Sequence, residues 1–435
     1  MSPVHVRRRR IALLLAVLVI VVLALTVRTA WAALSGPISP AASAAATPTN
    51  AANPAIPGNP APAGGDAAAA KASPAASAGP TAAPKPSPAA EQGAPGPSGQ
   101  TTPVRILRLS GNLASKSVVA SVKGQVFAQN MMYQHSVSVF GPDGALVRTI
   151  PDSVDLATFG IEGHEGRSQG APVEMDFSPD GKFAWVSNYH MYGKGFSKEP
   201  GDSCTSGEGY TDSFVYKIDT STHEIVKAVQ VGVVPKYLAV TPDGSKVVVS
   251  NWCSMDLDVI DTATDKVVAT VPSTGKYPRG IAISKDSRTA FVALMGSDKV
   301  VALDLRTNTV RDFAQPGSKT RHLSISPDGK RLYATNSRSN DVAEIDTATG
   351  EVLRKVTVGK EPRSMAISAD GQALYVVNYD ASTMSKIRTS DLTVTGTYPT
   401  DGHPIGITYE PTQKRVWVAC YGGTILVFDD SRLKG

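Results

Sequence analysis

A four-residue turn motif, Ser-Pro-Asp-Gly, recurs along the chain at a nearly constant interval. Its clearest copy spans Ser326 to Gly329, and the aligned copies step along the chain by 63, 43, 42, 42 and 42 residues. The first step is one period plus a 21-residue insertion. A fixed period in the low forties predicts a radially repeated fold such as a β-propeller. The copies begin at Ser178, Thr241, Ser284, Ser326, Ser368 and Glu410.

Each period contains four short stretches in which apolar and polar residues alternate, and this alternation predicts β-strands. The turn motif and its Asp-Gly variants between the stretches predict hairpins. A second marker, an Asp-Thr pair such as Asp346-Thr347, keeps the same interval, and two markers in phase make chance similarity improbable. We therefore expect four-stranded antiparallel blades. In the clearest repeat the strands are predicted at Leu323 to Ile325, Arg331 to Thr335, Val342 to Ile345 and Val352 to Val358.

The number of repeats predicts an all-β, seven-bladed propeller. A degenerate first blade occupies Val118 to Ile150, and the last blade, Ile405 to Phe428, has only three strand patterns. Val104 to Gly111 resembles an outer strand, so we expect it to complete the last blade and close the ring. The five full repeats between these blades begin near Val173, Lys236, Arg279, Arg321 and Arg363.

The first hundred residues differ in composition from the repeats. Four arginines, Arg7 to Arg10, precede an apolar run from Ile11 to Val27, and small residues follow at Ala30 to Ala32. This pattern predicts a signal peptide or a membrane anchor over residues 1–32, with the rest of the chain exported. Residues 33–102 are rich in Ala, Pro, Gly and Ser, so we expect a disordered linker. The propeller is expected at residues 103–435, in a chain that is secreted or anchored to the cell membrane facing outward.

A short motif follows the turn at four predicted second strands. Its four copies resemble the repeat of the YVTN-type β-propeller family of exported bacterial proteins. The similarity covers about three quarters of the chain. It implies the propeller fold and a binding role in the envelope or outside the cell, including single-stranded nucleic acid for some members. It is weak for function, because propellers host unrelated activities. The motif copies are YATN at Tyr333 to Asn336, WVSN at Trp185 to Asn188, VVSN at Val248 to Asn251 and YVVN at Tyr375 to Asn378.

Basic residues recur at the position eight residues before the turn glycine, which is the start of the innermost strand. Five of the seven aligned positions are basic, and the other two are Val173 and Ile405. Such residues would surround the mouth of the central channel and raise its positive potential together. The alternative to an anion-binding mouth is that these basic residues are ordinary solvated charges beside acids such as Glu174. The predicted anion-binding residues are Lys116, Lys236, Arg279, Arg321 and Arg363, joined by Asn188, Asn251, Asn336 and Asn378 from the second strands.

Two long insertions, at Pro151 to Ala171 and Tyr189 to Asp212, are expected on the same face as these residues. Cys204 lies in the second insertion, and Cys253 lies in the matching loop of the next blade. Neighbouring blades place these loops side by side, so we predict a Cys204–Cys253 disulfide, which suits an exported chain. Cys420 occupies the position of an asparagine in other blades and is expected to be a free, partly buried thiol.

Several histidines and acids lie in or near the insertions, but no recognised ligand spacing joins them. We therefore expect no cofactor and no metal site. The leading hypothesis is a monomeric binding module for an anionic polymer or envelope component. The alternative is a lyase or hydrolase that uses a cation with His and Glu on the same face. The residues that it would use include His164, His190, Asp202 and Glu208, with His135 and His403 further away in the sequence.

Overall fold

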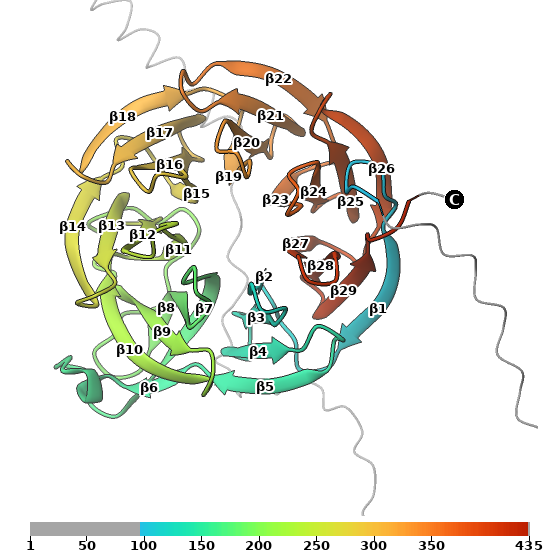
Figure 1. Ribbon diagram of the computed structural model, residues 1–435. Helices are drawn as coiled ribbons and strands as arrows, with labels where there is room; N and C mark the ends of the chain where they lie inside the picture. The colour runs from blue at the N-terminus through green and yellow to red at the C-terminus, as the bar shows by residue number, and fades with distance from the viewer. Residues whose placement is uncertain (1–95, 434–435) are drawn as a thin grey trace, which may run out of the picture. The chain divides into compact units, whose positions relative to one another are not determined.

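Seven antiparallel β-sheets form a ring in the computed structural model, which describes residues 96–433. The chain passes through the sheets in order around the circle, as the colours in Figure 1 show, and each sheet runs from an innermost to an outermost strand. The prediction of an all-β, seven-bladed propeller is confirmed for this part of the chain. The expected signal or anchor and most of the expected linker lie outside the described residues. Among the described residues, no helix has the length and apolar character needed to cross a membrane.

The first three blades hold strands β2 to β14. Blade 1 contains β2 (Ser117–Ala120), β3 (Val126–Asn130), β4 (Ser136–Phe140) and β5 (Leu146–Pro151). Blade 2 contains β7 (Arg167–Phe177), β8 (Phe183–Tyr192), β9 (Ser213–Asp219) and β10 (Glu224–Val231). Blade 3 contains β11 (Pro235–Val240), β12 (Lys246–Asn251), β13 (Asp256–Asp261) and β14 (Lys266–Pro272).

The other four blades repeat this order. Blade 4 contains β15 (Pro278–Ile283), β16 (Thr289–Leu294), β17 (Lys299–Asp304) and β18 (Thr309–Ala314). Blade 5 contains β19 (Thr320–Ile325), β20 (Arg331–Asn336), β21 (Asp341–Asp346) and β22 (Val352–Thr357). Blade 6 contains β23 (Pro362–Ile367), β24 (Ala373–Asn378), β25 (Thr383–Arg388) and β26 (Thr393–Pro399). Blade 7 contains β27 (Pro404–Glu410), β28 (Arg415–Cys420), β29 (Thr424–Asp429) and β1 (Val104–Ser110).

The two repeated sequence markers bond to each other, which explains why they keep the same interval. In blade 5 the Ser326 hydroxyl donates to Asp328 at 2.5 Å, and Gly329 adopts a positive φ of 78° that completes the turn. The Thr347 hydroxyl of the Asp-Thr marker then donates to the Gly329 carbonyl at 2.7 Å. The same bond joins Thr220 to Gly181, Thr262 to Gly244 and Thr389 to Gly371. The motif is therefore a structural device that locks one hairpin onto the next.

The apolar core is divided into clusters, and each of seven clusters joins one pair of neighbouring blades. In the cluster between blades 2 and 3, for example, Trp185 of β8 packs with Leu238 of β11. Trp185 is 1% exposed, as expected for an aromatic residue that packs between blades. Because every blade is packed on both neighbours, the ring is continuous around the channel.

The ring is closed where the two ends of the described chain meet. β1 pairs antiparallel with β29, from Val104 with Asp429 to Ser110 with Thr424, so the earliest strand forms the outer edge of the last blade. Beside it, a fully buried ion pair joins Lys386 of β25 to Asp430 at 2.7 Å. The Lys386 ammonium also donates to the Thr101 carbonyl at 2.7 Å, and Tyr375 donates to Asp430. One lysine of blade 6 therefore holds the segments that precede β1 and follow β29.

Blade 2 is larger than the sequence alone indicates. The insertion predicted at Pro151 to Ala171 is not a simple loop, because it forms a fifth strand, β6 (Ser153–Asp155), and a 3-10 helix, η1 (Leu156–Phe159). β6 pairs with the lengthened start of β7, and β8 runs on into the second predicted insertion as far as Tyr192. Both differences arise because β7 and β8 keep pairing beyond the usual blade length, which leaves fewer unpaired backbone groups.

The buried Lys386–Asp430 pair predicts a specific stability test. Substitution Asp430→Ala should lower the free energy of unfolding by about 3–5 kcal/mol, because it leaves a buried, uncompensated ammonium. The double substitution Lys386→Met with Asp430→Leu should recover part of that loss, since apolar side chains replace both charges. Urea unfolding of the variants would measure this. A loss below about 1 kcal/mol for Asp430→Ala would show that the pair does not hold the ring.

Candidate functional site

Four of the five basic residues of the predicted ring lie at β-bulges in the innermost strands. In blade 3, Pro235 pairs with Asn251 and Tyr237 pairs with Ser250, so Lys236 has no partner in the ladder. In blade 5 the same irregularity leaves out Arg321, between Thr320 and His322. A bulge re-aims the side chain of its extra residue. Arg279 and Arg363 occupy the matching irregularities of blades 4 and 6, and Lys116 directly precedes β2 in blade 1.

These side chains converge closely enough to affect one another's ionisation. Burial and the positive charges of Arg279, Lys236, Arg321 and Arg363 together hold the pKa of Lys116 well below its ordinary value. Burial, followed by repulsion from Arg279, lowers the pKa of Lys236 to about 8. Burial also lowers the pKa of Arg321. The five basic residues therefore form a single electrostatic unit, which we call the cationic ring.

Acidic side chains balance the cationic ring only in part. Asp202 pairs with Lys236 at 3.0 Å, and Glu361 pairs with Arg363 at 2.7 Å. Glu174 lies near Arg279 and attracts it electrostatically, without a direct ion pair. Within residues 96–433 no ion pair involves Lys116, Arg279 or Arg321. The ring thus keeps an excess of positive charge, on two buried residues, Lys236 and Arg279, and three half-buried ones.

The predicted role of the asparagines as ligand-binding groups does not fit their placement. The side chains of Asn188, Asn251, Asn336 and Asn378 are all 0% exposed. Asn336 accepts a hydrogen bond from Thr320 at 2.9 Å and donates to Asp341 at 2.6 Å. Asn251 and Asn378 likewise donate to residues of their own blades, and the Asn188 amide is enclosed without a partner among the described residues. Asn336 thus links the end of the second strand to the start of the first, beside the bulge that holds Arg321, whereas Asn251 and Asn378 link the second strand to the third.

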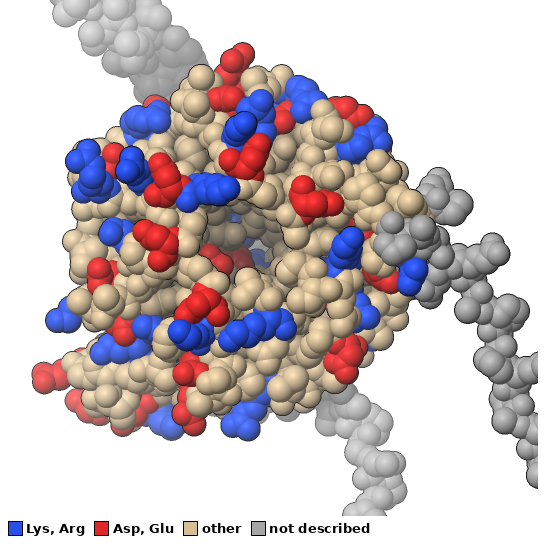
Figure 2. Space-filling model, in the orientation of Figure 1, with Lys and Arg blue, Asp and Glu red and all other residues tan. Residues whose placement is uncertain are grey.

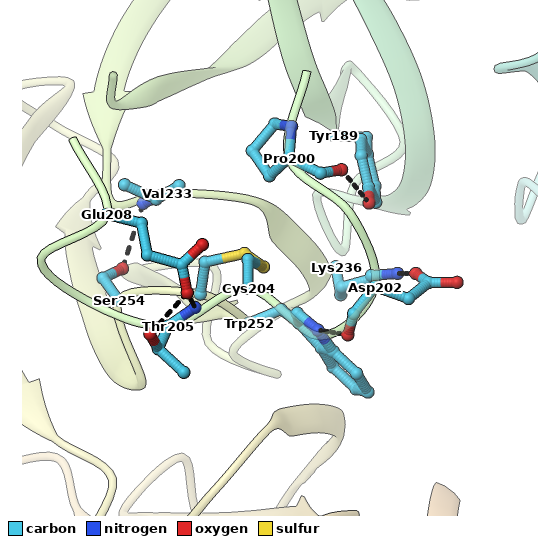
Figure 3. Close-up of a disulfide and its surroundings, with 11 residues drawn as sticks. Tyr189, Pro200, Asp202, Cys204, Thr205, Glu208, Val233, Lys236, Trp252 and Ser254 are labelled. Carbon is cyan, nitrogen blue, oxygen red and sulfur yellow. Dashed lines mark hydrogen bonds and ion pairs between the residues drawn. A yellow bond between two sulfur atoms is a disulfide. The ribbon is translucent and has the colours of Figure 1, made fainter. Parts of the chain in front are cut away.

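The second insertion covers part of the cationic ring. Cys204 and Cys253 form the predicted disulfide, with a Cα–Cα distance of 5.3 Å. Figure 3 shows that Asp202, two residues before Cys204, reaches Lys236 while its carbonyl accepts a hydrogen bond from the Trp252 indole at 3.0 Å. The disulfide therefore pins the insertion to blade 3, where it supplies a counter-charge to the ring.

Aromatic side chains surround two of the basic residues. The Lys236 ammonium lies 4.6 Å from the Tyr189 ring centre and 4.8 Å from that of Trp252. The Arg363 guanidinium lies 3.3 Å from the Tyr379 ring centre, a close cation–π contact. Tyr189 and Trp252 are buried, so they hold Lys236 and are not free to stack on a ligand.

A channel cavity of about 350 Å³ lies along the innermost strands. Its lining includes Glu174, Asp176, Tyr237 and His322. Burial raises the pKa of Glu174 to about 7 and that of Asp176 to about 6, and it lowers that of His322 to about 3. Glu174 was expected only as an acid beside the basic residues, and Asp176 and His322 were not predicted. The signal was present, because these residues lie one or three positions after the aligned start of their innermost strands.

One face of the propeller is hollowed at its centre. Figure 2 shows Lys and Arg interspersed with Asp and Glu around this opening. Residues 1–95 account for the whole formal charge of +5 of the chain, so residues 96–435 are formally neutral, in agreement with this mixed pattern. The excess positive charge of the site is therefore a property of the cationic ring and not of the surface as a whole.

The histidines and acids that the enzyme alternative requires do not converge. His190 lies in β8, is 2% exposed and bonds to the Ser197 carbonyl, and His164 stacks on Phe196. Glu208 accepts hydrogen bonds from Thr205. Across the described part of the chain, no group of three or more His, Cys, Asp and Glu side chains is arranged to hold a metal ion. Cys420 is fully buried and free, and burial raises its pKa to about 12.

Comparisons with known proteins agree with the fold. A family model for YNCE-like beta-propellers matches residues 272–430, which correspond to blades 4 to 7. A chain of the Kuenenia stuttgartiensis hydrazine synthase is 19% identical, with a TM-score of 0.58, and the similarity covers 73% of this chain and 96% of that chain. No curated protein matches the chain. Together with the seven blades, these matches support the propeller fold, and a similarity at this identity concerns the fold alone.

Removal of the disulfide should loosen the insertion without unfolding the ring. The substitutions Cys204→Ser and Cys253→Ser should lower the free energy of unfolding by about 2–4 kcal/mol, because the bridge restricts the unfolded chain. Peptide mapping without reductant should recover the two cysteines in one cross-linked peptide. Recovery of both as alkylated thiols would contradict the disulfide.

Proposed function

We propose that the chain is an extracytoplasmic binding module of the YVTN type that holds a polyanionic ligand at the cationic ring. The observation that carries this proposal is the convergence of five basic side chains of which three, Lys116, Arg279 and Arg321, form no ion pair among the described residues, with Arg279 only 9% exposed. A buried charge without a partner is costly, and an anion that enters the ring would offset this cost.

The positions of the basic residues favour a ligand with several charges. The five basic residues come from five blades and act on each other through space, so a ligand bound at the mouth of the channel would feel all of them. Exposed aromatic residues lie near Arg363, since Tyr421 is 47% exposed and interacts with Tyr379 and Arg363. Aromatic rings beside a basic groove can stack on bases or sugars. An anionic polymer, such as a single-stranded nucleic acid or an acidic envelope polymer, fits this combination.

Export is part of the same proposal. The arginines and apolar run at the start of the sequence support export, with the chain secreted or held at the outer side of the cell membrane. The Cys204–Cys253 disulfide suits the oxidising conditions outside the cytoplasm. A monomer is the simplest assembly, because a closed ring leaves no sheet edge at the seam for a second copy to pair with.

Charge reversal of the cationic ring tests the binding role. The double substitution Arg279→Glu with Arg321→Glu should weaken binding of a single-stranded oligonucleotide or polyphosphate at low salt by at least about tenfold, because two attractive charges become repulsive. The dependence of log affinity on log salt should also become shallower by about one unit or more. Fluorescence anisotropy at several salt concentrations would measure both quantities.

The matched control for charge reversal is Arg306→Glu with Lys330→Glu. These two exposed basic residues lie in the β17–β18 and β19–β20 turns, at the opposite ends of the strands from the ring. The control should bind almost as the wild type does. Equal binding by the control and the ring variant would refute a role for the cationic ring.

The ionisation of the ring predicts a pH dependence. As the pH falls from 9 to 6, Lys236, with a pKa of about 8, gains a positive charge, and Glu174, with a pKa of about 7, loses a negative one. Both changes favour an anion, so affinity at constant salt should rise. Glu174→Gln should bind more tightly than the wild type at pH 8 and should lose the part of the rise near pH 7. A pH-independent affinity would contradict this account.

A further inference from the structure

A separate cavity lies beside the cationic ring, between the loops of blades 5 and 6. Its volume is about 430 Å³, within the range typical of small-molecule sites. Asn340 contributes to its wall and accepts a hydrogen bond from the Glu361 backbone at 2.8 Å. The charged residues of the lining are Lys319, Arg321, Arg338, Lys360, Glu361 and Asp380. We call this space the interblade cavity.

The charges of the interblade cavity do not balance. Four basic and two acidic residues give a formal charge of +2. Both acids are already paired, since Asp380 faces Lys360 at 3.5 Å and Glu361 bonds to Arg363 of the ring at 2.7 Å. In the described part of the chain, Lys319, Arg321 and Arg338 form no ion pair.

Arg321 provides a second, independent observation. Its Nε atom is enclosed and has no hydrogen-bond partner. Its Nη1 atom lies 4.0 Å from the Met295 sulfur, which is a weak acceptor. Buried donors are nearly always satisfied in folded proteins, so a guanidinium group that lines a cavity and has only a thioether as acceptor can donate strongly to a ligand there.

The loops that carry Lys319 and Arg338 are fixed relative to each other. The Ser337 backbone donates to the Lys319 carbonyl at 3.1 Å, and the Arg338 backbone donates to the Ser318 carbonyl at 3.2 Å. Asp298 bonds to the backbone of Lys319 at 2.6 Å and to the Ser318 hydroxyl at 3.1 Å, so it holds the loop. The basic side chains therefore start from a rigid frame, which lowers the entropy cost of binding a ligand.

We propose that the interblade cavity is a second anion subsite, which takes a phosphate group and shares Arg321 with the cationic ring. A phosphate monoester carries a charge of about −1.5 to −2 at neutral pH, which matches the formal +2 of the lining. Arginine presents several donors in a planar fork that suits phosphate oxygens, and the cavity holds two arginines. A single carboxylate would leave more of this charge unbalanced.

Sharing of Arg321 determines what kind of ligand fits. One face of the ligand would occupy the ring and another would occupy the interblade cavity, so the ligand must carry at least two anionic groups. This inference rests on the proposed function and narrows it from polyanions in general to phosphorylated molecules or phosphate-containing polymers whose end or branch reaches outward between blades 5 and 6.

The test uses the full-length chain and inorganic tripolyphosphate as the probe, with calorimetry at low salt. Lys319→Gln with Arg338→Gln should weaken tripolyphosphate binding by about tenfold or more, because two phosphate contacts are lost. The control, Arg306→Gln with Lys330→Gln, removes the same charge from the opposite ends of the strands and should change the affinity less than about twofold. Tricarballylate, a tricarboxylate, should bind more weakly than tripolyphosphate to the wild type.

The outcomes separate this inference from the proposed function. If Arg279→Gln weakens binding of tripolyphosphate while the cavity variant binds as the control does, the ring stands and the second subsite is refuted. If the cavity variant loses affinity and Arg279→Gln does not, the ligand does not extend from the interblade cavity into the cationic ring. The proposal that both sites use Arg321 for one ligand is then refuted. If the cavity variant loses affinity for tricarballylate by the same factor as for tripolyphosphate, the cavity does not prefer phosphate and the phosphate assignment is overturned. No binding by the wild type would overturn both proposals.

Discussion

The closure of the ring is the constraint on which every other feature of this propeller depends. Each blade is packed on its neighbours, blade 1 packs on blade 7, and blade 7 gains its outermost strand only through β1. The buried Lys386 contacts both Thr101 and Asp430, so the two ends of the described chain are held by one side chain. A buried ion pair adds little net stability, yet removal of one partner is costly. The pair therefore enforces the correct closure more than it strengthens the fold.

The cationic ring exists at the expense of local stability, and the surrounding structure limits that cost. Bulges at the start of the innermost strands direct Lys236 and Arg321 toward other cations, where burial and repulsion lower their pKa values. Asp202, Glu361 and Glu174 offset part of the charge. Full neutralisation by the protein would leave nothing for a ligand to gain. The residual positive charge is thus the feature of this site that most favours the binding of an anion.

The architecture could be predicted from the sequence because its determinants are local and repeated. The turn motif and the Asp-Thr marker bond to each other within one blade, as Gly329 and Thr347 do, so they must recur together. The positions of the basic residues followed from the same alignment. The ligand-binding role predicted for the asparagines was misjudged. Asn336 at the end of β20 and Arg321 at the start of β19 lie on the same face of the ring, and the sequence does not show that the asparagine side chain is enclosed by its neighbours. The interblade cavity could not be predicted, since its walls come from separate loops whose spacing no repeat determines.

Two blades have no basic residue at the aligned position, so the electric field of the cationic ring is asymmetric. Val173 of blade 2 and Ile405 of blade 7 are apolar and buried, and they flank the single lysine of blade 1, while blades 3 to 6 carry four consecutive cations. The centre of positive charge therefore lies off the channel axis, toward the side that also contains the interblade cavity. An anion drawn along this field would approach obliquely, and the sevenfold pseudosymmetry of the backbone would not make the seven directions equivalent for a ligand.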